Sequence, residues 1–170
     1  DTTAPTFEEA AGQLDATIEC DEDSSIAALG TPVPHDNCSA DNEITLVSND
    51  EIIDGACANT YTIIRTWTAT DLCGVNSTDF IQTIEVQDTT APELTCPADI
   101  TVANDTGVCG ASVDFEVLVS DNCSDLANIV LDLTHQSGDF FPVSTTTVVT
   151  ATATDECGNT VDCSFSITVV

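Results

Sequence analysis

The chain of 170 residues repeats itself, and this constrains its fold more than any other feature. Three motifs occur twice in the same order: DTTAP at 1–5 and 88–92, DNCS at 36–39 and 121–124, and TATDLCG at 68–74, which returns as TATDECG at 152–158. Ordered repetition of this kind indicates two copies of one structural unit, each of about 85 residues. The repeat predicts a boundary between Gln87 and Asp88, and therefore two domains, 1–87 and 88–170.

Within each copy the apolar residues recur with a period of two. Between 111 and 119 the apolar residues that share one face are Ala111, Val113, Phe115, Val117 and Val119. This alternation predicts a half-buried strand. The segments 44–46, 80–86, 129–133 and 163–169 show the same pattern, and turn-forming residues separate them. The sequence therefore predicts an all-β fold of two sandwiches with about seven strands each.

Acidic residues dominate the charge of the chain. Asp and Glu number 30, Arg65 is the single basic residue, and the formal net charge is −29. This balance excludes nucleic acid and anionic membrane surfaces as partners, since both require clustered Lys and Arg. We expect no membrane insertion, because the apolar runs are too short to span a bilayer. Self-repulsion between the acids is relieved either by bound cations or by a solvated acidic surface, and the two can coexist.

Residues 88–170 closely resemble the hyalin-repeat (HYR) domain. The motifs that carry this resemblance are TCPADITV (95–102), DTGVCGA (105–111), DNCS (121–124), SGDFFPVSTTTVVTATATD (137–155) and CSFSITVV (163–170). The first copy, through CANTYTIIRTWTATDLCG (57–74), resembles a related repeat found beside HYR domains in large bacterial surface proteins, although it lacks the CP and CSF cysteines. The resemblance implies two tandem immunoglobulin-like domains that serve adhesion or act as spacers, without catalytic activity.

Nine cysteines indicate an oxidising, extracellular compartment. The absence of a CxxC pair disfavours a zinc site. In an immunoglobulin-like order the DNC and DxCG loops share one end of each unit, so we expect the disulfides Cys38–Cys73 and Cys123–Cys157. We also expect Cys20–Cys57 at the opposite end of the first unit, and Cys96–Cys163 between the first and last strands of the second unit, which run parallel. Cys109 is left over. Its parity with Ala111 favours a buried thiol, and an intermolecular bridge is the alternative.

Oxygen-bearing side chains gather in the loops expected at that same end of each unit. The candidate ligands are Asp88, Asp121, Asn122, Asp155 and Asn159 in the second copy, and Asp1, Asp36, Asn37 and Asp71 in the first. Such a set suits structural Ca²⁺, which takes six to eight oxygen ligands. A cation at the junction would also face Asp21, Glu22 and Asp23. The alternative is that Asp and Asn are simply good turn formers.

Other candidates have plainer interpretations. We expect a solvated His35, an ion pair between Arg65 and a cross-strand acid, and a Trp67 that belongs to the core. No nucleophile elbow or ordered triad is present. Four asparagines fit the N-x-S/T pattern, which matters only where the source glycosylates secreted proteins: Asn37, Asn76, Asn104 and Asn122.

The expected function is that of a structural repeat segment of an extracellular adhesin or surface filament, giving rigid extension and attachment. The expected partners are neighbouring copies or repeats in head-to-tail contact, and surface glycans are candidate ligands. One alternative is a carbohydrate-binding accessory module of a secreted enzyme, which would need an exposed aromatic platform. Another is a separate subunit that stacks into filaments. We expect no enzyme activity.

Overall fold

A computed structural model describes residues 2–170 of the chain. The backbone divides into two compact units, Asp1–Asp88 and Thr89–Val170, called unit 1 and unit 2 below. This division falls one residue after the boundary that the repeat predicts. The described residues contain no helix that is long and apolar enough to cross a membrane.

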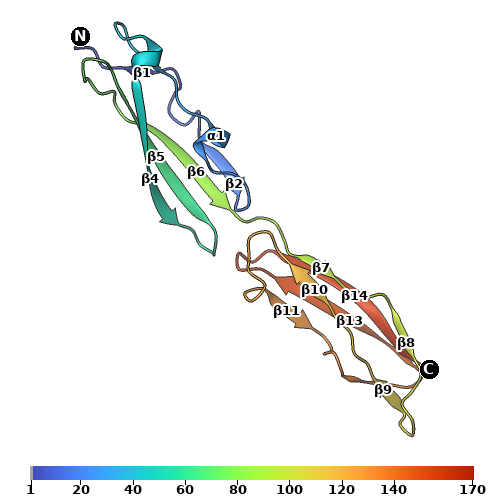
Figure 1. Ribbon diagram of the computed structural model, residues 1–170. Coiled ribbons are helices and arrows are strands. Elements are labelled where there is room, and N and C mark those ends of the chain that lie inside the picture. The colour runs from blue at the N-terminus through green and yellow to red at the C-terminus, as the bar shows by residue number, and fades with distance from the viewer. Residues whose placement is uncertain (1) are drawn as a thin grey trace. The chain divides into compact units, whose positions relative to one another are not determined.

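Unit 1 is built from strands with one short helix and one 3₁₀ turn. Its elements are β1 (Thr6–Phe7), β2 (Ala16–Glu19), α1 (Ile26–Leu29), β3 (Pro34–His35), η1 (Asp41–Glu43), β4 (Thr45–Asp54), β5 (Tyr61–Thr70) and β6 (Phe80–Gln87). The main sheet has the order β2-β6-β5-β4 (Figure 1). β1 pairs with β3 in a second, two-stranded sheet. β2 runs parallel to β6, whereas the other neighbours are antiparallel. The predicted strands over 44–46 and 80–86 are therefore confirmed.

The alternation along β5 and β6 gives unit 1 its buried face. Ile63, Ile84 and Val86 form the centre of its apolar cluster. Trp67 is 3% exposed, so the prediction that it belongs to the core is confirmed. Its indole Nε1 donates a hydrogen bond to Oε1 of the fully buried Gln82 at 3.2 Å, and the amide of Gln82 donates in turn to the carbonyl oxygen of Leu14 at 2.9 Å. A satisfied polar network therefore lies within this core.

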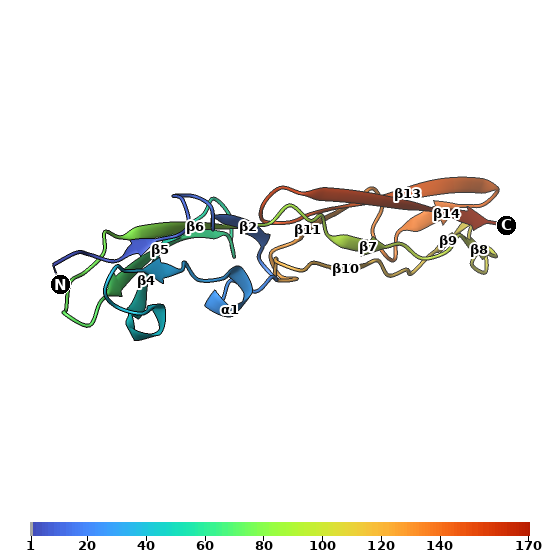
Figure 2. The ribbon, with the colours of Figure 1, turned by 90° about the horizontal axis from the view of Figure 1, so that it is seen from above.

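Unit 2 consists of strands alone among its described elements. They are β7 (Glu93–Thr95), β8 (Ile100–Val102), β9 (Gly110–Ser112), β10 (Leu118–Ser120), β11 (Val130–Leu133), β12 (Phe140–Pro142), β13 (Thr145–Thr154) and β14 (Thr160–Val169). The main sheet has the order β11-β13-β14-β8, with β8 parallel to β14. Two smaller pairs, β10-β7 and β12-β9, complete the unit. Figure 2 shows β10 and β13 on opposite sides of unit 2, as in a sandwich.

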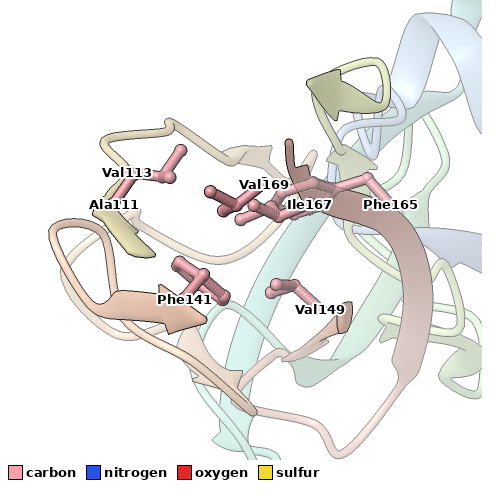
Figure 3. Close-up of a cluster of buried hydrophobic side chains, with 7 residues drawn as sticks. All are labelled: Ala111, Val113, Phe141, Val149, Phe165, Ile167 and Val169. Carbon is pink, nitrogen blue, oxygen red and sulfur yellow. The ribbon is translucent and has the colours of Figure 1, made fainter. Parts of the chain in front are cut away.

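The core of unit 2 lies between these layers. Phe165, Ile167 and Val169 project inward at alternate positions of β14, and Val149 projects from the neighbouring β13. Across the interior, Phe141 of β12 completes the cluster, together with residues 111 and 113 (Figure 3). These side chains are at most 4% exposed. The predicted strand over 163–169 is confirmed, and its period of two is what buries these residues.

The predicted strand over 111–119 is only partly correct. β9 ends at Ser112 and β10 begins at Leu118, and the residues between them lie outside any strand. The two pieces pair with different partners, β9 with β12 and β10 with β7. The alternating pattern identified the buried face, but it did not show that the chain changes strand partners midway along the segment.

Candidate metal centres

The loop after β10 in unit 2 is folded around the carboxylate of Asp121. Its Oδ1 accepts backbone hydrogen bonds from Cys123 at 2.9 Å and Ser124 at 2.6 Å. This is the geometry in which an aspartate side chain closes a turn on the residues that follow it. Part of the turn-forming interpretation is therefore correct, since one oxygen of this carboxylate organises the loop.

The corresponding loop of unit 1 has the same construction. Oδ1 of Asp36 accepts from the backbone of Cys38 at 2.9 Å and of Ser39 at 2.8 Å. The N–H groups of Ser39 and then of Cys38 hold the pKa of Asp36 below its ordinary value, because they stabilise the ionised form. Two sequence copies have thus produced two copies of one acidic turn.

The second loop of each site follows the long strand β13 or β5. In unit 2, Oδ1 of Asp155 accepts from the backbone of Cys157 and Asn159, each at 2.8 Å, and Oδ2 accepts from the side-chain amide of Asn159 at 2.8 Å. In unit 1, Oδ1 of Asp71 accepts from the backbone of Val75 at 2.7 Å. Val75 occupies the position that corresponds to Asn159, but it has no side-chain amide that could donate a second hydrogen bond. One oxygen of Asp71 is consequently left for another partner.

A serine joins the two loops in each unit. Oγ of Ser39 accepts from the backbone of Leu72 at 3.4 Å, and Oγ of Ser124 accepts from the backbone of Glu156 at 3.3 Å. Both serines are buried. The prediction that the DNC and DxCG loops meet at one end of each unit is therefore confirmed.

Buried carboxylate oxygens without hydrogen-bond donors are the most informative feature of these loops. Among the described residues, Oδ2 of Asp36, Asp71 and Asp121 is buried and accepts no hydrogen bond. In unit 2 the carboxylates of Asp121 and Asp155 each offer an oxygen, and these two oxygens lie within 4.8 Å of each other. Burying a carboxylate oxygen without a donor is costly, and so is placing two like charges this close. A bound cation would offset both costs.

The remaining predicted ligands differ in how deeply they are buried. Asn37 and Asn122 are exposed, and Asp88 is buried at the end of unit 1. Asp1 lies outside the described residues. Asp21, Glu22 and Asp23 are exposed, and their expected role at the junction stays a prediction.

Asp23 has local partners instead. It accepts hydrogen bonds from the backbone and the hydroxyl of Ser25, which lower its pKa, the backbone bond having the larger effect. Ser25 itself caps α1, since its Oγ accepts from the backbone of Ala28 at 3.4 Å. This carboxylate therefore helps to fix the start of a helical turn.

Two charged side chains in unit 1 form ion pairs. Arg65 is opposite Asp50 in the β4–β5 register, and its Nε and Nη2 donate to the two oxygens of that carboxylate at 2.8 and 2.9 Å. The predicted cross-strand pair is thus confirmed, and Arg65 lowers the pKa of Asp50. His35 lies 3.0 Å from Oδ1 of Asp41 and 3.4 Å from Oε2 of Glu8, and these contacts, the first above all, raise its pKa. The sequence indicated only a solvated histidine.

The cysteines confirm one predicted bond and contradict another. Cys96 and Cys163 form the predicted disulfide, with a Cα–Cα distance of 6.0 Å. Cys38 is an exposed thiol, so the predicted bond between Cys38 and Cys73 is wrong. Their loops share one end of the unit, but a disulfide also requires Cα atoms within about 7 Å and suitably directed Cβ atoms. Loop topology alone does not supply that geometry.

Four further cysteines are oxidised. Cys20, Cys57, Cys123 and Cys157 are all disulfide-bonded, which fits their predicted state, while the expected pairings Cys20–Cys57 and Cys123–Cys157 stay predictions. Cys109 is an exposed thiol, so the expectation that it is buried is wrong. β9 begins at Gly110, and Cys109 lies in the turn before it, where the strand's alternation does not apply.

Comparison with known proteins finds similarity to one domain family. The HYR domain model matches residues 87–169. Hyalin from Strongylocentrotus purpuratus is 31% identical over 172 aligned positions, which include 99% of this chain and 14% of hyalin. The chain thus spans a small part of that relative. An origin in bacterial surface proteins stays a prediction.

Solved structures give weaker likenesses. Drosophila N-cadherin EC1-4 aligns with 99% of this chain and 50% of its own, at 15% identity and a TM-score of 0.42. Human protocadherin-24 EC1-2 aligns with 99% of both chains, at 17% identity and a TM-score of 0.38. At these scores no argument is drawn from them. The similarity to the HYR domain falls on residues 87–169, which include nearly all of unit 2.

Proposed function

We propose that the chain is a structural repeat segment of an extracellular adhesin or surface filament, in which the units give rigid extension and attachment. The match of residues 87–169 to the HYR domain is the observation that carries this proposal. Similarity to hyalin along 99% of the chain supports it. The six disulfide-bonded cysteines support an extracellular setting, because such bonds persist in oxidising compartments. The proposed role is not catalytic.

The proposed partners are neighbouring copies or repeats in head-to-tail contact. Such contacts are heterologous and do not close on themselves, so they generate extended rods or fibres rather than discrete dimers. Surface glycans are a further proposed class of partner. The acidic surface of the chain, with a net charge of −29, favours partners that carry positive charge or bind through cations.

A carbohydrate-binding accessory module is not favoured. Glycan platforms use an exposed aromatic ring, and Trp67 is buried with its indole N–H engaged by Gln82. Tyr61 is half-buried and lines a hollow of about 480 Å³ beside Arg65.

Immunogold labelling of the intact source tests the extracellular role. Antibodies raised against the 170-residue chain should label unpermeabilised cells or their matrix, along extended material. Labelling that appears only after permeabilisation, or only on discrete soluble particles, would contradict the proposal. Preimmune serum and chain-absorbed antibody are the matched controls.

We also propose that structural Ca²⁺ binds at the acidic loops of each unit. In the second sequence copy, 88–170, the ligands are Asp121 and Asp155, with Asp88, Asn122 and Asn159 completing the set. In unit 1 the ligands are Asp36 and Asp71, with Asp1 and Asn37. The oxygen-only donors suit a hard cation, and the sulfurs of Cys123 and Cys157 are oxidised, so they are not available as thiolate ligands for zinc. The buried carboxylate oxygens without donors support this proposal.

Urea unfolding followed by the fluorescence of Trp67, the only tryptophan, tests the calcium site of unit 1. Extracellular calcium modules bind at about 10⁻⁴–10⁻³ M. At 10 mM Ca²⁺ and a Kd of about 1 mM, binding stabilises the unit by about 1.4 kcal/mol. NaCl of equal ionic strength should give a smaller shift. Asp71→Asn should abolish the calcium-specific increment, and Glu51→Gln, on an exposed strand, should keep it. Equal increments in both variants would refute the site.

A further inference from the structure

A hollow of about 480 Å³ opens in unit 1 beside β4, the strand at the edge of its main sheet. Three cross-strand pairs of β4 and β5 line it, together with the segment 23–25 that precedes α1. The pairs are Asp50 with Arg65, Ile52 with Ile63, and Asp54 with Tyr61. The hollow thus has the size of a ligand pocket and combines apolar side chains with a few convergent polar groups.

Unit 2 shows how a complete sandwich covers the same part of the sheet. Because TATD begins at 68 and again at 152, Val149 corresponds to Arg65. Val149 belongs to the buried cluster that Phe141 of β12 completes (Figure 3). β12 lies between β11 and β13 in the chain, whereas no described element lies between β4 and β5. Unit 1 therefore lacks a counterpart of β12, and its hollow adjoins the residue that replaces Val149.

Arg65 has a hydrogen-bonding capacity that unit 1 does not use. It is 4% exposed, and its Nε and Nη2 donate to Asp50. Nη2 also donates to the carbonyl oxygen of Ser24 at 3.3 Å. Nη1 is buried and has no acceptor among the described residues. A buried donor without an acceptor is costly, above all on a charged group, so an occupant that brings a carbonyl or hydroxyl oxygen is favoured over a purely apolar one.

The free edge of β4 offers a place for a further strand. β4 ends the order β2-β6-β5-β4 and has 10 residues, whereas β11, the edge strand at the corresponding place in unit 2, has 4 (Figure 1). Alternate backbone N–H and C=O groups of an edge strand point away from the sheet. Ile52 on this strand is 64% exposed. A strand added here would place every second side chain on the face of Ile52, over the hollow.

The charges around the hollow determine which segment can be added. Asp23, Asp50 and Asp54 line it against Arg65 alone. A second copy of this chain would meet these acids with a net charge of −29, and its single basic residue is already paired. Like charges on neighbouring strands are destabilising, so the acids disfavour pairing between copies. They attract a segment that carries Lys or Arg.

We propose that the β4 edge and its hollow bind an extended, basic segment of a different protein by strand addition. The main chain of the segment pairs with the outward N–H and C=O groups of β4. On the face of the hollow, an apolar side chain of the segment covers Ile52, and a Lys or Arg two residues away lies near Asp54. This inference deepens the attachment proposed above, on which it rests, by naming the chemistry of one partner.

Amide hydrogen exchange of the 170-residue chain, followed by NMR, tests the proposal with a synthetic peptide. The peptide has Thr at every second position and Lys and Val in turn between them. In physiological salt, millimolar peptide should slow exchange at alternate amides of β4, those that point away from β5. Two matched peptides should have no effect. One is N-methylated along one edge, which blocks strand pairing, and the other has Glu in place of Lys.

Unchanged exchange along β4 would overturn the inference, as would an equal effect of either matched peptide. Slowing that appears without peptide as the chain is concentrated would identify a second copy as the occupant and would also overturn it. These results do not depend on surface labelling of the source, so failure here is distinguishable from failure of the proposed function.

Two neighbouring residues of β4 provide a matched pair of variants. Ile52 and Ile53 are both exposed, at 64% and 51%, but they lie on opposite faces of the strand, and Ile52 alone of the two lines the hollow. Thr keeps the branched side chain that suits a strand. Ile52→Thr should weaken peptide binding about fivefold, because less apolar surface is covered, and Ile53→Thr should change it little. Equal effects of the two substitutions would refute the part assigned to the hollow.

Discussion

Replacing Asp50 by asparagine should destabilise unit 1 by about 3 kcal/mol. Arg65 is 4% exposed, and both oxygens of Asp50 accept its hydrogen bonds. The substitution keeps the shape but leaves a buried guanidinium without its counter-charge. Removing one partner of a buried pair costs about 3–5 kcal/mol. The side chain of Asp50 is 37% exposed, so water can replace part of the loss, which places the expected cost at the lower end.

Fluorescence of Trp67 provides the assay. Trp67 lies two residues beyond Arg65 on β5 and is the only tryptophan, so its transition reports unit 1 alone. With an m value of about 1 kcal/mol/M in urea, the midpoint should fall by about 3 M. A smaller fall is expected for the double variant Asp50→Leu with Arg65→Met, because it leaves no buried charge.

The matched control is Glu51→Gln. Glu51 neighbours Asp50 on β4 and is exposed, and its substitution removes the same charge from a chain at −29. Both variants therefore reduce the repulsion among the acidic residues equally, so a difference between their midpoints reports the loss of the ion pair. Coincident midpoints for Asp50→Asn and Glu51→Gln would refute the argument that the pair compensates a buried charge.

Three further predictions concern other features of the two units. Replacing Cys96 and Cys163 by serine should destabilise unit 2 by about 4 kcal/mol in the loop-entropy model, given their separation of 67 residues, and circular dichroism should show this with no change in the tryptophan transition. The pKa of His35 is raised by its acidic neighbours, which therefore stabilise unit 1 fully below the unfolded pKa of about 6.5. This stabilisation is lost as the pH rises through the folded pKa. His35→Gln should remove this pH dependence of the urea midpoint. Gly110→Ala should destabilise unit 2 in thermal unfolding, because a Cβ there would lie 2.3 Å from the carbonyl oxygen of Phe141; unchanged melting would show that the backbone yields easily.

The repeated motifs and the alternation of apolar residues made much of the fold predictable from the sequence. The ordered motifs located the two units and brought the DNC and DxCG loops to one end, as the hydrogen bonds of Ser39 and Ser124 show. Alternation identified the buried face of β14, and opposite charge on neighbouring strands was enough to anticipate a partner for Arg65. These inferences depend on period and topology, which a sequence carries directly.

Details that depend on local geometry could not be predicted in the same way. The parity that suggested a buried Cys109 stops where β9 begins, one residue later. Shared loop ends did not bring the sulfurs of Cys38 and Cys73 into a bond. Gln82 has the strand parity of a core residue but a polar side chain, and only the structure reveals that Trp67 and Leu14 satisfy it.

The parallel pairing of β2 with β6, and of β8 with β14, determines how each unit would respond to tension. When the two ends of a unit are pulled apart, parallel strands are drawn in opposite directions along their length, so their hydrogen bonds are loaded together in shear rather than one after another. In unit 2 the load also passes through the Cys96–Cys163 bond, which shields the chain between these residues from extension.

Reduction of the Cys96–Cys163 disulfide would allow the chain between these two residues to extend once the strands have separated. The redox state of this bond therefore limits how far unit 2 can lengthen under tension.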